Sequence, residues 1–318
     1  MPKWNLDYDS RRRELIQNYT YDEVAEIMTE EFGEKFTSES IRCRCKTFNE
    51  TKNKHKFSNT GKETLNTFKK ESIRKKVNKK YLDLPHPVKI LVLSDIHIPY
   101  HKSKMIENII EKEEADIVVL AGDILDLGFA SSFKVTKDLN FKMESNPATE
   151  LLEMLDTKYE KIFWLKGNHE ARIDNFISDI DSGFKEFAKE RLDILSYFEE
   201  MYEDLIVIDD YYLKLGNVLI SHPRTKGAVV PCKPLIQMHE HFTAIQEKFD
   251  ILIMGHTHYN SIVKHNGKLL VETGCLCYEP DYRHEGRPIR RAWSNGYVIY
   301  ETNDKGITDI NSIKLVHL

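Results

Sequence analysis

The stretch VKILVLSDIH, residues 88–97, decides the fold of this chain, because a run of apolar residues ends there in polar side chains. The apolar residues are largely consecutive rather than alternating, which is typical of a strand that is buried on both faces. Later stretches follow the same pattern and are separated by segments of helical character: ADIVVLAGD, KIFWLKGN, NVLISH, DILIMGH and KLLVETG. The sequence therefore predicts an α/β domain over residues 87–318.

Five of these runs end in residues of one chemical kind, namely Asp, Asn or His. The residues are Asp95 and His97, Asp123 and Asp126, Asn168 and His169, His222, and His256 and His258. Because the carboxyl ends of strands in an open α/β sheet border one crevice, we expect these side chains to meet there. Imidazole, carboxylate and amide oxygen suit divalent ions such as Mn, Fe, Co, Ni or Zn. So many ligands favour two ions about 3.5–4 Å apart, bridged by one carboxylate.

In chain order, the motifs D-x-H, GD-x-x-D, GNHE, a single His after a strand and GH-x-H resemble those of the calcineurin-like metallophosphoesterase superfamily. The resemblance covers roughly residues 88–275 and implies a four-layer α-β-β-α sandwich of two sheets with helices outside. It also implies a role for each residue. Asp95, His97 and His258 would hold one metal ion, Asn168, His222 and His256 would hold the other, and Asp123 would bridge the two. His169 would act in catalysis, and Asp126 would orient the His169 ring. For Asp126, capping a helix is the alternative.

The resemblance further implies hydrolysis of phosphate esters by a metal-bound hydroxide that attacks phosphorus in line with the leaving oxygen. His169 would stabilise the charged phosphate or protonate the leaving oxygen. The sequence departs from the phosphoprotein phosphatases of the superfamily at Leu127, where those enzymes have an Arg that grips the phosphate. Because a dianionic monoester gains more from such a cation than a diester does, Leu127 favours a diester substrate. Arg172 or Lys166 could replace the missing cation, and a surface or framework charge is the favoured alternative for each.

Two further segments contain residues suited to substrate binding. After the predicted ligand His222, the segment SHPRTKGAVVPCKP offers Arg224 and Lys226 to phosphate. The later segment CLCYEPDYRHEGRPIRRAWSNGYVIYE includes Tyr282 and Arg283 in a mixture of aromatic and Arg residues that is typical of single-stranded nucleic-acid binding. The alternative for this later segment is a loop that covers the sandwich, with its aromatic side chains partly in the core.

The first 86 residues differ in character from the predicted α/β domain. Residues 1–50 predict short helices, and a capping box from Thr20 to Glu23 opens the second helix. The helix, turn and basic helix in this region resemble a helix-turn-helix module, and a small helical bundle with solvated charges is the alternative. Residues 51–86 predict a basic linker or arm. Residues 42–80 contain 14 Lys and Arg against 3 acids, although the whole chain has a net charge of −5.

The cysteines are Cys43, Cys45, Cys232, Cys275 and Cys277. Their odd number argues against a disulfide framework, and the two C-x-C pairs do not provide four zinc ligands at a suitable spacing. We therefore expect buried or half-buried free thiols. The chain has no apolar run near 18 residues and no hydrophobic signal region after Met1, so the sequence predicts a cytoplasmic protein.

These features predict a metal-dependent phosphodiesterase or nuclease that acts on DNA or RNA through two divalent ions. Mn²⁺ is the expected ion, with Fe, Ni, Co or Zn as alternatives, and residues 1–80 would bind the nucleic acid. No feature predicts a membrane partner. One alternative is a phosphomonoesterase for phosphoproteins or small phosphate compounds. The other is a nucleic-acid-binding regulator whose phosphoesterase-like domain is structural, and the intact set of ligand positions argues against it.

Overall fold

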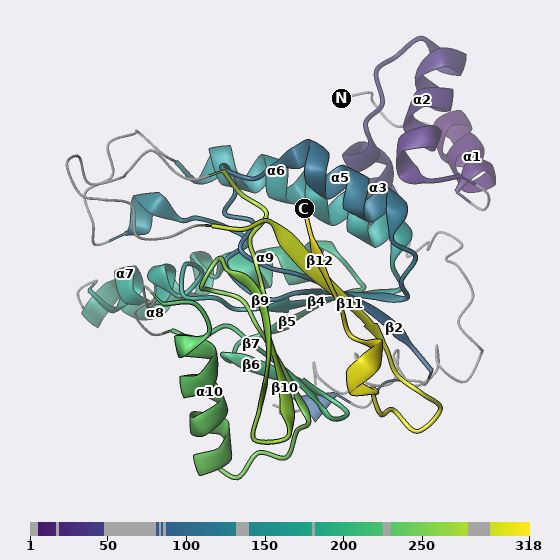
Figure 1. Cartoon of the computed structure of the whole chain (residues 1–318). Helices are drawn as coiled ribbons and strands as arrows, with labels where there is room; N and C mark the ends of the chain where they lie inside the picture. Colours follow the sequence, from purple (N-terminus) through teal and green to yellow (C-terminus); the bar gives the residue numbers. More distant parts are fainter. Residues whose placement is uncertain are drawn as a thin grey trace. The chain divides into compact units, whose positions relative to one another are not determined.

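A computed structural model describes residues 6–16, 19–47, 81–82, 84, 87–131, 140–179, 182–224, 230–278 and 293–318. The chain forms two compact units, Met1–Lys56 and Phe57–Leu318, which we describe separately (Figure 1). The predicted basic arm lies almost entirely outside the described residues. Among the residues that are described, no helix has both the length and the apolar character that crossing a membrane requires.

The described residues of the N-terminal unit form three helices, α1 (Leu6–Leu15), α2 (Tyr21–Phe32) and α3 (Ser38–Thr47). The predicted capping box is present: the Glu23 amide donates to the Thr20 hydroxyl, and the Thr20 amide donates to the Glu23 carboxylate. Gly33 ends α2 in the left-handed conformation. Arg42 is buried, so this residue of the predicted basic helix does not face solvent. The small apolar core of the unit includes Leu15, Ile16, Val24, Met28, Ile41 and Cys45.

The second unit is built on two six-stranded sheets. The first sheet has the order β12 (Lys314–His317), β11 (Gly296–Glu301), β2 (Lys89–Leu93), β3 (Ile117–Leu120), β4 (Lys161–Leu165) and β5 (Leu205–Ile208). The second sheet has the order β1 (Tyr81–Leu82), β6 (Tyr212–Leu215), β7 (Val218–Ser221), β8 (Ile251–Met254), β10 (Lys268–Thr273) and β9 (Asn260–His265). The strands β2, β3, β4 and β5 are parallel to one another, as are β7, β8 and β10. Parallel neighbours bring several strand ends to one edge.

Both faces of the parallel strands are buried, which explains their continuous apolar sequences. In β2, Ile90 and Val92 belong to the core between the two sheets, whereas Leu91 and Leu93 belong to the core under the helices of the first sheet. A third apolar cluster lies on the other face of the second sheet, where Phe242 packs against its strands. The alternation of side chains along each strand therefore fills two cores at once.

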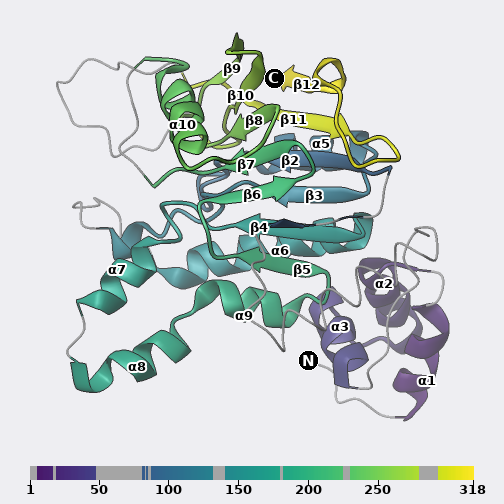
Figure 2. The same ribbon diagram turned by 90° about the horizontal axis from the view of Figure 1, so that it is seen from below.

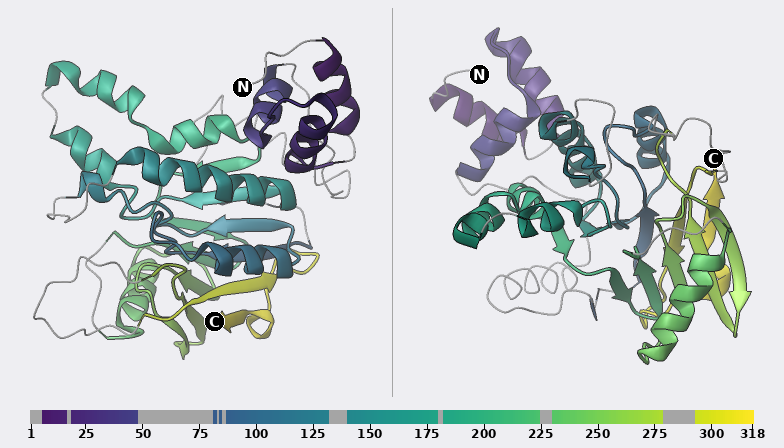
Figure 3. Two further views of the ribbon diagram at one scale, coloured as in Figure 1. Left: turned by 90° about the horizontal axis from the view of Figure 1, so that it is seen from above. Right: turned by 90° about the vertical axis from the view of Figure 1, so that its left-hand side faces the viewer.

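Helices cover the outer face of each sheet and complete the predicted four layers (Figures 1 and 2). The helices associated with the first sheet are α5 (Ser103–Lys112), α6 (Phe141–Lys158), α7 (Arg172–Ser178), α8 (Ser182–Arg191) and α9 (Ile194–Met201). A single described helix, α10 (Lys233–Ala244), packs on the second sheet. Figure 3 shows the same layering from two further directions. The fold class predicted from the sequence is confirmed.

The described cysteine side chains are free thiols, as predicted. Cys45, Cys275 and Cys277 are buried, and Cys232 is partly buried.

Candidate metal centre

The loops that follow five strands carry the predicted ligand residues to one edge of the two sheets. Asp95 and His97 follow β2, Asp123 follows β3, Asn168 follows β4, His222 follows β7, and His256 and His258 follow β8. Five of these residues have left-handed backbone angles: Asp95 (φ 52°), His97 (49°), Asp123 (53°), His256 (78°) and His258 (59°). Such angles are uncommon for residues other than glycine, and clusters of them occur at functional sites. The turns that aim the ligands are therefore strained.

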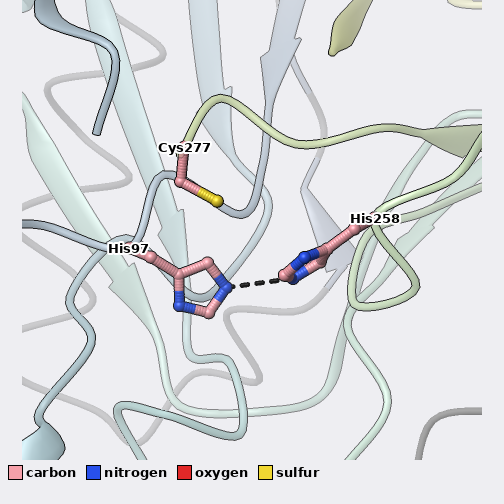
Figure 4. A group of neighbouring side chains, drawn as sticks. All are labelled: His97, His258 and Cys277. Atoms are coloured by element: carbon pink, nitrogen blue, oxygen red, sulfur yellow. Dashed lines mark hydrogen bonds between the residues drawn. The ribbon is translucent and has the colours of Figure 1, made fainter. Parts of the chain in front are cut away.

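A first group of donor atoms forms where the loops after β2 and β8 meet. His258 Nε2 lies 3.1 Å from Asp95 Oδ1 and 3.1 Å from His97 Nε2 (Figure 4). The Asp95 carboxylate is held in place by the His256 amide, which donates to both oxygens at 2.9–3.0 Å, and by the Ser94 hydroxyl. Asp95, His97 and His258 therefore come together as the resemblance implied.

A second group forms around His222. Its Nε2 atom lies 3.1 Å from Asp123 Oδ2 and 3.2 Å from Asn168 Oδ1, and His256 Nδ1 lies 2.5 Å from the same amide oxygen. Asp123 also reaches toward the first group, because its Oδ2 atom is 3.8 Å from His97 Nε2. The side chains of Asn168, His222 and His256 therefore gather beside Asp123, whose carboxylate lies between the two groups.

The donor atoms of the second group fit a cation. His222 Nδ1 lies 2.7 Å from the carbonyl oxygen of Ala121, which can only accept, so Nδ1 carries the ring proton. A neutral His222 then turns its Nε2 lone pair toward Asp123 and Asn168, whose facing oxygens are acceptors too. Exchanging the oxygen and nitrogen of the Asn168 amide would let the nitrogen donate to His222, His256 and Asp123 without an ion. A bound cation would instead favour the oxygen in its present position. Two further buried nitrogens, His256 Nε2 and His258 Nδ1, have no hydrogen-bond partner within the described part of the chain.

The charge of Asp123 also favours protonation of His222. Burial by itself lowers the pKa of His222, but the adjacent Asp123 carboxylate outweighs burial and raises that pKa to about 9. The potential that attracts a proton to this ring also attracts a divalent ion, which binds the deprotonated nitrogen. The residues of the site therefore fit divalent metal binding.

His169 lies beside the two groups and is held by Asp126 through both backbone and side chain. Its Nδ1 atom is 2.8 Å from the Asp126 carbonyl oxygen and 3.2 Å from Asp126 Oδ1. The same Oδ1 atom lies 3.3 Å from His97 Nδ1, so one carboxylate faces two imidazoles. Burial lowers the pKa of His169 despite the nearby Asp123. The Asp126 carboxylate therefore faces the rings of His97 and His169 rather than a helix end.

The predicted substrate-binding residues differ in where they lie. Arg172 is at the site, because its guanidinium lies 2.9 Å from His169 Nε2 and donates to the Asp126 carbonyl oxygen at 2.6 Å. Arg224 lies 3.8 Å from the carboxylate of Asp209. Lys166 pairs with Asp174 and Asp209 at 2.7 and 3.0 Å, so its charge is already balanced. The remaining three, Lys226, Tyr282 and Arg283, fall outside the described residues.

Sequence reasoning gave no role to two buried glutamates that support the site. Glu170 accepts hydrogen bonds at 2.7–3.0 Å from the amides of Asp123, Ile124, Leu125 and Gly167. Glu144 accepts from the amide of Leu127 at 2.8 Å. Glu170 directly follows the GNH motif, but a single acid in a turn has no spacing that reveals four backbone donors. Glu144 lies on α6, far along the sequence from the loop it supports.

Comparison with protein families matches the calcineurin-like phosphoesterase model to residues 88–260, a span that contains every predicted metal ligand. Similar solved structures include an archaeal phosphodiesterase, with 17% identity over 72% of this chain and 99% of that chain and a TM-score of 0.39. Zinc-bound Vps29 of Entamoeba histolytica has 16% identity over 72% and 98%, with a TM-score of 0.36. A metallophosphoesterase from Sphaerobacter thermophilus has 13% identity over 73% and 88%, with a TM-score of 0.37. A comparison with curated proteins gave no match.

Proposed function

The chain belongs to the calcineurin-like phosphoesterase family of hydrolases, and on this basis we propose that it is a phosphodiesterase with two metal ions that cleaves DNA or RNA. The observation that carries the proposal is the position of Asp123. Its Oδ2 atom lies 3.1 Å from His222 Nε2 in one group of ligands and 3.8 Å from His97 Nε2 in the other. A carboxylate between two ions is the arrangement that two-metal hydrolysis uses.

Asp95, His97 and His258 would hold one ion, and Asn168, His222 and His256 the other, with Asp123 between them. When bound, two divalent ions neutralise charge on the phosphoryl oxygens and lower the pKa of a water molecule. Mn²⁺ is the ion that we propose for activity, because the carboxylate and amide oxygens of the site suit it.

His169 would act on the leaving oxygen. Its Nδ1–H donates to the Asp126 carbonyl oxygen, so Nε2 is the atom left to face the substrate, and it can give up a proton when the ring is in its imidazolium form. Arg172 now occupies the space beside Nε2, and a phosphate oxygen bound there would accept from its guanidinium instead. Both side chains are largely buried, which strengthens their interaction with a developing charge.

Leu127 supports a diester as the substrate. This residue follows Asp126, is buried, and occupies the position where phosphoprotein phosphatases have a phosphate-binding Arg. A diester carries one negative charge and needs less cationic compensation than a monoester with two. The 14 basic residues against 3 acids in residues 42–80 support a polyanionic diester such as nucleic acid.

A phosphomonoesterase is the alternative, and Arg172 favours it. The guanidinium lies 2.9 Å from His169 Nε2 and could supply the cation that Leu127 does not. Arg172 would then bind the second charge of a monoester.

The test compares phosphate-ester cleavage by the full-length protein with Mn²⁺ on duplex DNA, single-stranded DNA, RNA and an aryl phosphomonoester. His169→Ala removes the proposed proton donor, and His317→Ala, at an exposed histidine of β12, is the matched control. We expect nucleic-acid cleavage to fall by about 10²–10⁴-fold in His169→Ala and to be unchanged in His317→Ala. Monoester turnover without nucleic-acid cleavage would refute the diesterase proposal in favour of the alternative.

A second measurement addresses the basic region. We propose that residues 1–80 bind nucleic acid, so deleting them should weaken DNA or RNA binding and reduce its dependence on salt concentration. An unchanged salt dependence after the deletion would assign binding to the phosphoesterase domain alone.

A further inference from the structure

Cys277 lies next to the first group of ligands and has no role in the proposed hydrolysis. It follows β10 and is 2% exposed. The segment around it is fastened to the ligand loop after β2: the Leu276 amide donates to the Asp95 carbonyl oxygen at 3.0 Å, and the Tyr278 amide donates to the Tyr100 carbonyl oxygen at 2.8 Å. A backbone bridge joins Cys277 to His101. Cys277 is therefore positioned by the same loop that carries Asp95 and His97.

The thiol converges with two imidazoles on one space. The Sγ atom of Cys277 and one ring nitrogen each of His97 and His258 all lie within 4.8 Å of one another. Figure 4 shows the three side chains approaching from three separate segments. All three residues are at least nine-tenths buried, and among the residues that the structure describes His258 Nδ1 has no hydrogen-bond partner. Buried nitrogen and sulfur donors that meet in this way are typical of a metal site.

We propose that Cys277 is a ligand of the ion held by Asp95, His97 and His258, and that its sulfur makes this position selective for Zn²⁺. This inference rests on the proposed two-metal centre. On binding, the Sγ–H bond breaks, the Sγ–metal bond forms, and the proton leaves to solvent. Thiolate is a soft ligand that selects Zn²⁺ over Mn²⁺. The second position, formed by nitrogen and oxygen atoms alone, then remains the position for Mn²⁺.

The distances are compatible with such a ligand set. With Asp123 as its fifth ligand the Zn²⁺ would be five-coordinate, and two of its nitrogen ligands would lie roughly 2.8–3.5 Å apart, given Zn–N distances of about 2.0 Å. His97 Nε2 and His258 Nε2 are 3.1 Å apart. A nitrogen and a sulfur on the same ion lie roughly 3.6 Å apart, so Sγ needs to move by about 1.2 Å at most from its present limit of 4.8 Å.

Cys275 provides an internal control for this role. It is also buried and lies two residues away, and its thiol is in hydrogen-bonding contact with that of Cys277. Its Sγ atom accepts from Asn295 Nδ2 at 3.6 Å. Among the described residues, it belongs to no group of potential metal ligands, whereas Cys277 does. The two thiols share their burial but differ in their access to the ion.

The test is the absorption spectrum of the full-length protein loaded with Co²⁺, which replaces Zn²⁺ and reports sulfur ligation directly. We expect a thiolate-to-cobalt charge-transfer band in the near ultraviolet for the wild type and for Cys275→Ser. Cys277→Ser should lose this band and keep the visible d–d bands, which show that Co²⁺ is bound. Because the wild-type spectrum needs no substitution, a cobalt-loaded wild type without the charge-transfer band would overturn the proposal even if Cys277→Ser does not fold.

The outcomes separate this inference from the proposed function. Visible Co²⁺ bands without charge transfer would overturn the sulfur ligand and leave the two-metal centre intact. Failure to bind Co²⁺ at all would overturn both. In a competition between Zn²⁺ and Mn²⁺, metal analysis should show that the preference for Zn²⁺ falls at least about tenfold in Cys277→Ser. Removing even a residue that only supports a metal ligand costs about that much in metal affinity. An unchanged preference would contradict the proposed selectivity.

Discussion

Glu170→Gln should destabilise the protein strongly, although the substitution preserves the size and shape of the side chain. The carboxylate is 3% exposed, and each of its oxygens accepts two backbone hydrogen bonds. Oε1 accepts from Ile124 and Leu125, and Oε2 accepts from Asp123 and Gly167. An amide replaces one oxygen by an NH₂ group, so two buried N–H groups lose their acceptor and face a donor.

The magnitude follows from those two orphaned donors. Leaving one buried donor unsatisfied costs about 1–3 kcal/mol, so two cost about 2–6 kcal/mol in the free energy of unfolding. Because Asp123 is one of the residues held, metal affinity should also fall by about 10–100-fold.

Urea unfolding in the presence of EDTA measures the effect without the contribution of bound metal. Burial and the nearby Asp123 raise the pKa of Glu170, so a mildly alkaline buffer is appropriate. Glu107→Gln, at an exposed position of α5, is the matched control and should change the unfolding free energy by less than about 0.5 kcal/mol. If Glu170→Gln unfolds within about 1 kcal/mol of the wild type, the four amides are not held by a carboxylate as described.

Two further substitutions test the support of the site. In Gly167→Ala the added Cβ would collide with the carboxylate and backbone nitrogen of Asp123, so we expect the free energy of unfolding to fall by about 1–3 kcal/mol and metal binding to be lost. Gly183→Ala is the control, because a Cβ at Gly183 meets no described atom within 4 Å. Equal urea midpoints for the two variants would contradict this expectation. Burial, together with the charge of Asp126, raises the pKa of Glu144 from 4.5 to about 8, although the Leu127 amide opposes the shift. The Glu144 carboxyl group therefore loses its proton at a lower pH in the unfolded chain than in the folded protein. As a result, the free energy of unfolding of the wild type falls as pH rises from 4.5 to about 8. Glu144→Gln should remove up to about 4 kcal/mol of this pH-dependent loss of stability. If the difference in unfolding free energy between Glu144→Gln and the wild type does not change with pH, the raised pKa of Glu144 is refuted.

The strands and most of the candidate site could be predicted from the sequence because both depend on residues that are neighbours along the chain. A strand buried on two faces requires consecutive apolar residues, as in β2, and its end fixes where the next side chains lie. Asp95, His97 and His258 therefore could be placed together before any contact was visible. The family motifs then supplied roles that residue spacing alone does not contain.

The parts that could not be predicted depend on contacts between distant segments. Glu144 supports Leu127 across 17 residues, and Glu170 reaches Asp123 across 47. Neither pairing leaves a periodic signal in the sequence. The left-handed angles at five ligands could not be predicted either, because such angles are uncommon for residues other than glycine and no local pattern in the sequence marks them. For the same reason the sequence predicts only a buried or half-buried free thiol at Cys277, since its approach to His97 comes from the pairing of two remote loops.

The antiparallel pairing of β11 with β2 has a consequence for how the enzyme is made. Val92 pairs with Val298, so a strand synthesised early waits for a partner about 200 residues later. At about 5–20 residues per second, the ribosome needs roughly 10–40 s to supply it. The Leu276 amide that holds the Asp95 loop emerges at nearly the same late stage. A nascent chain can thus form its β2–β4 sheet early and still be unable to close the metal centre, which keeps a hydrolase inactive until β11 has been synthesised.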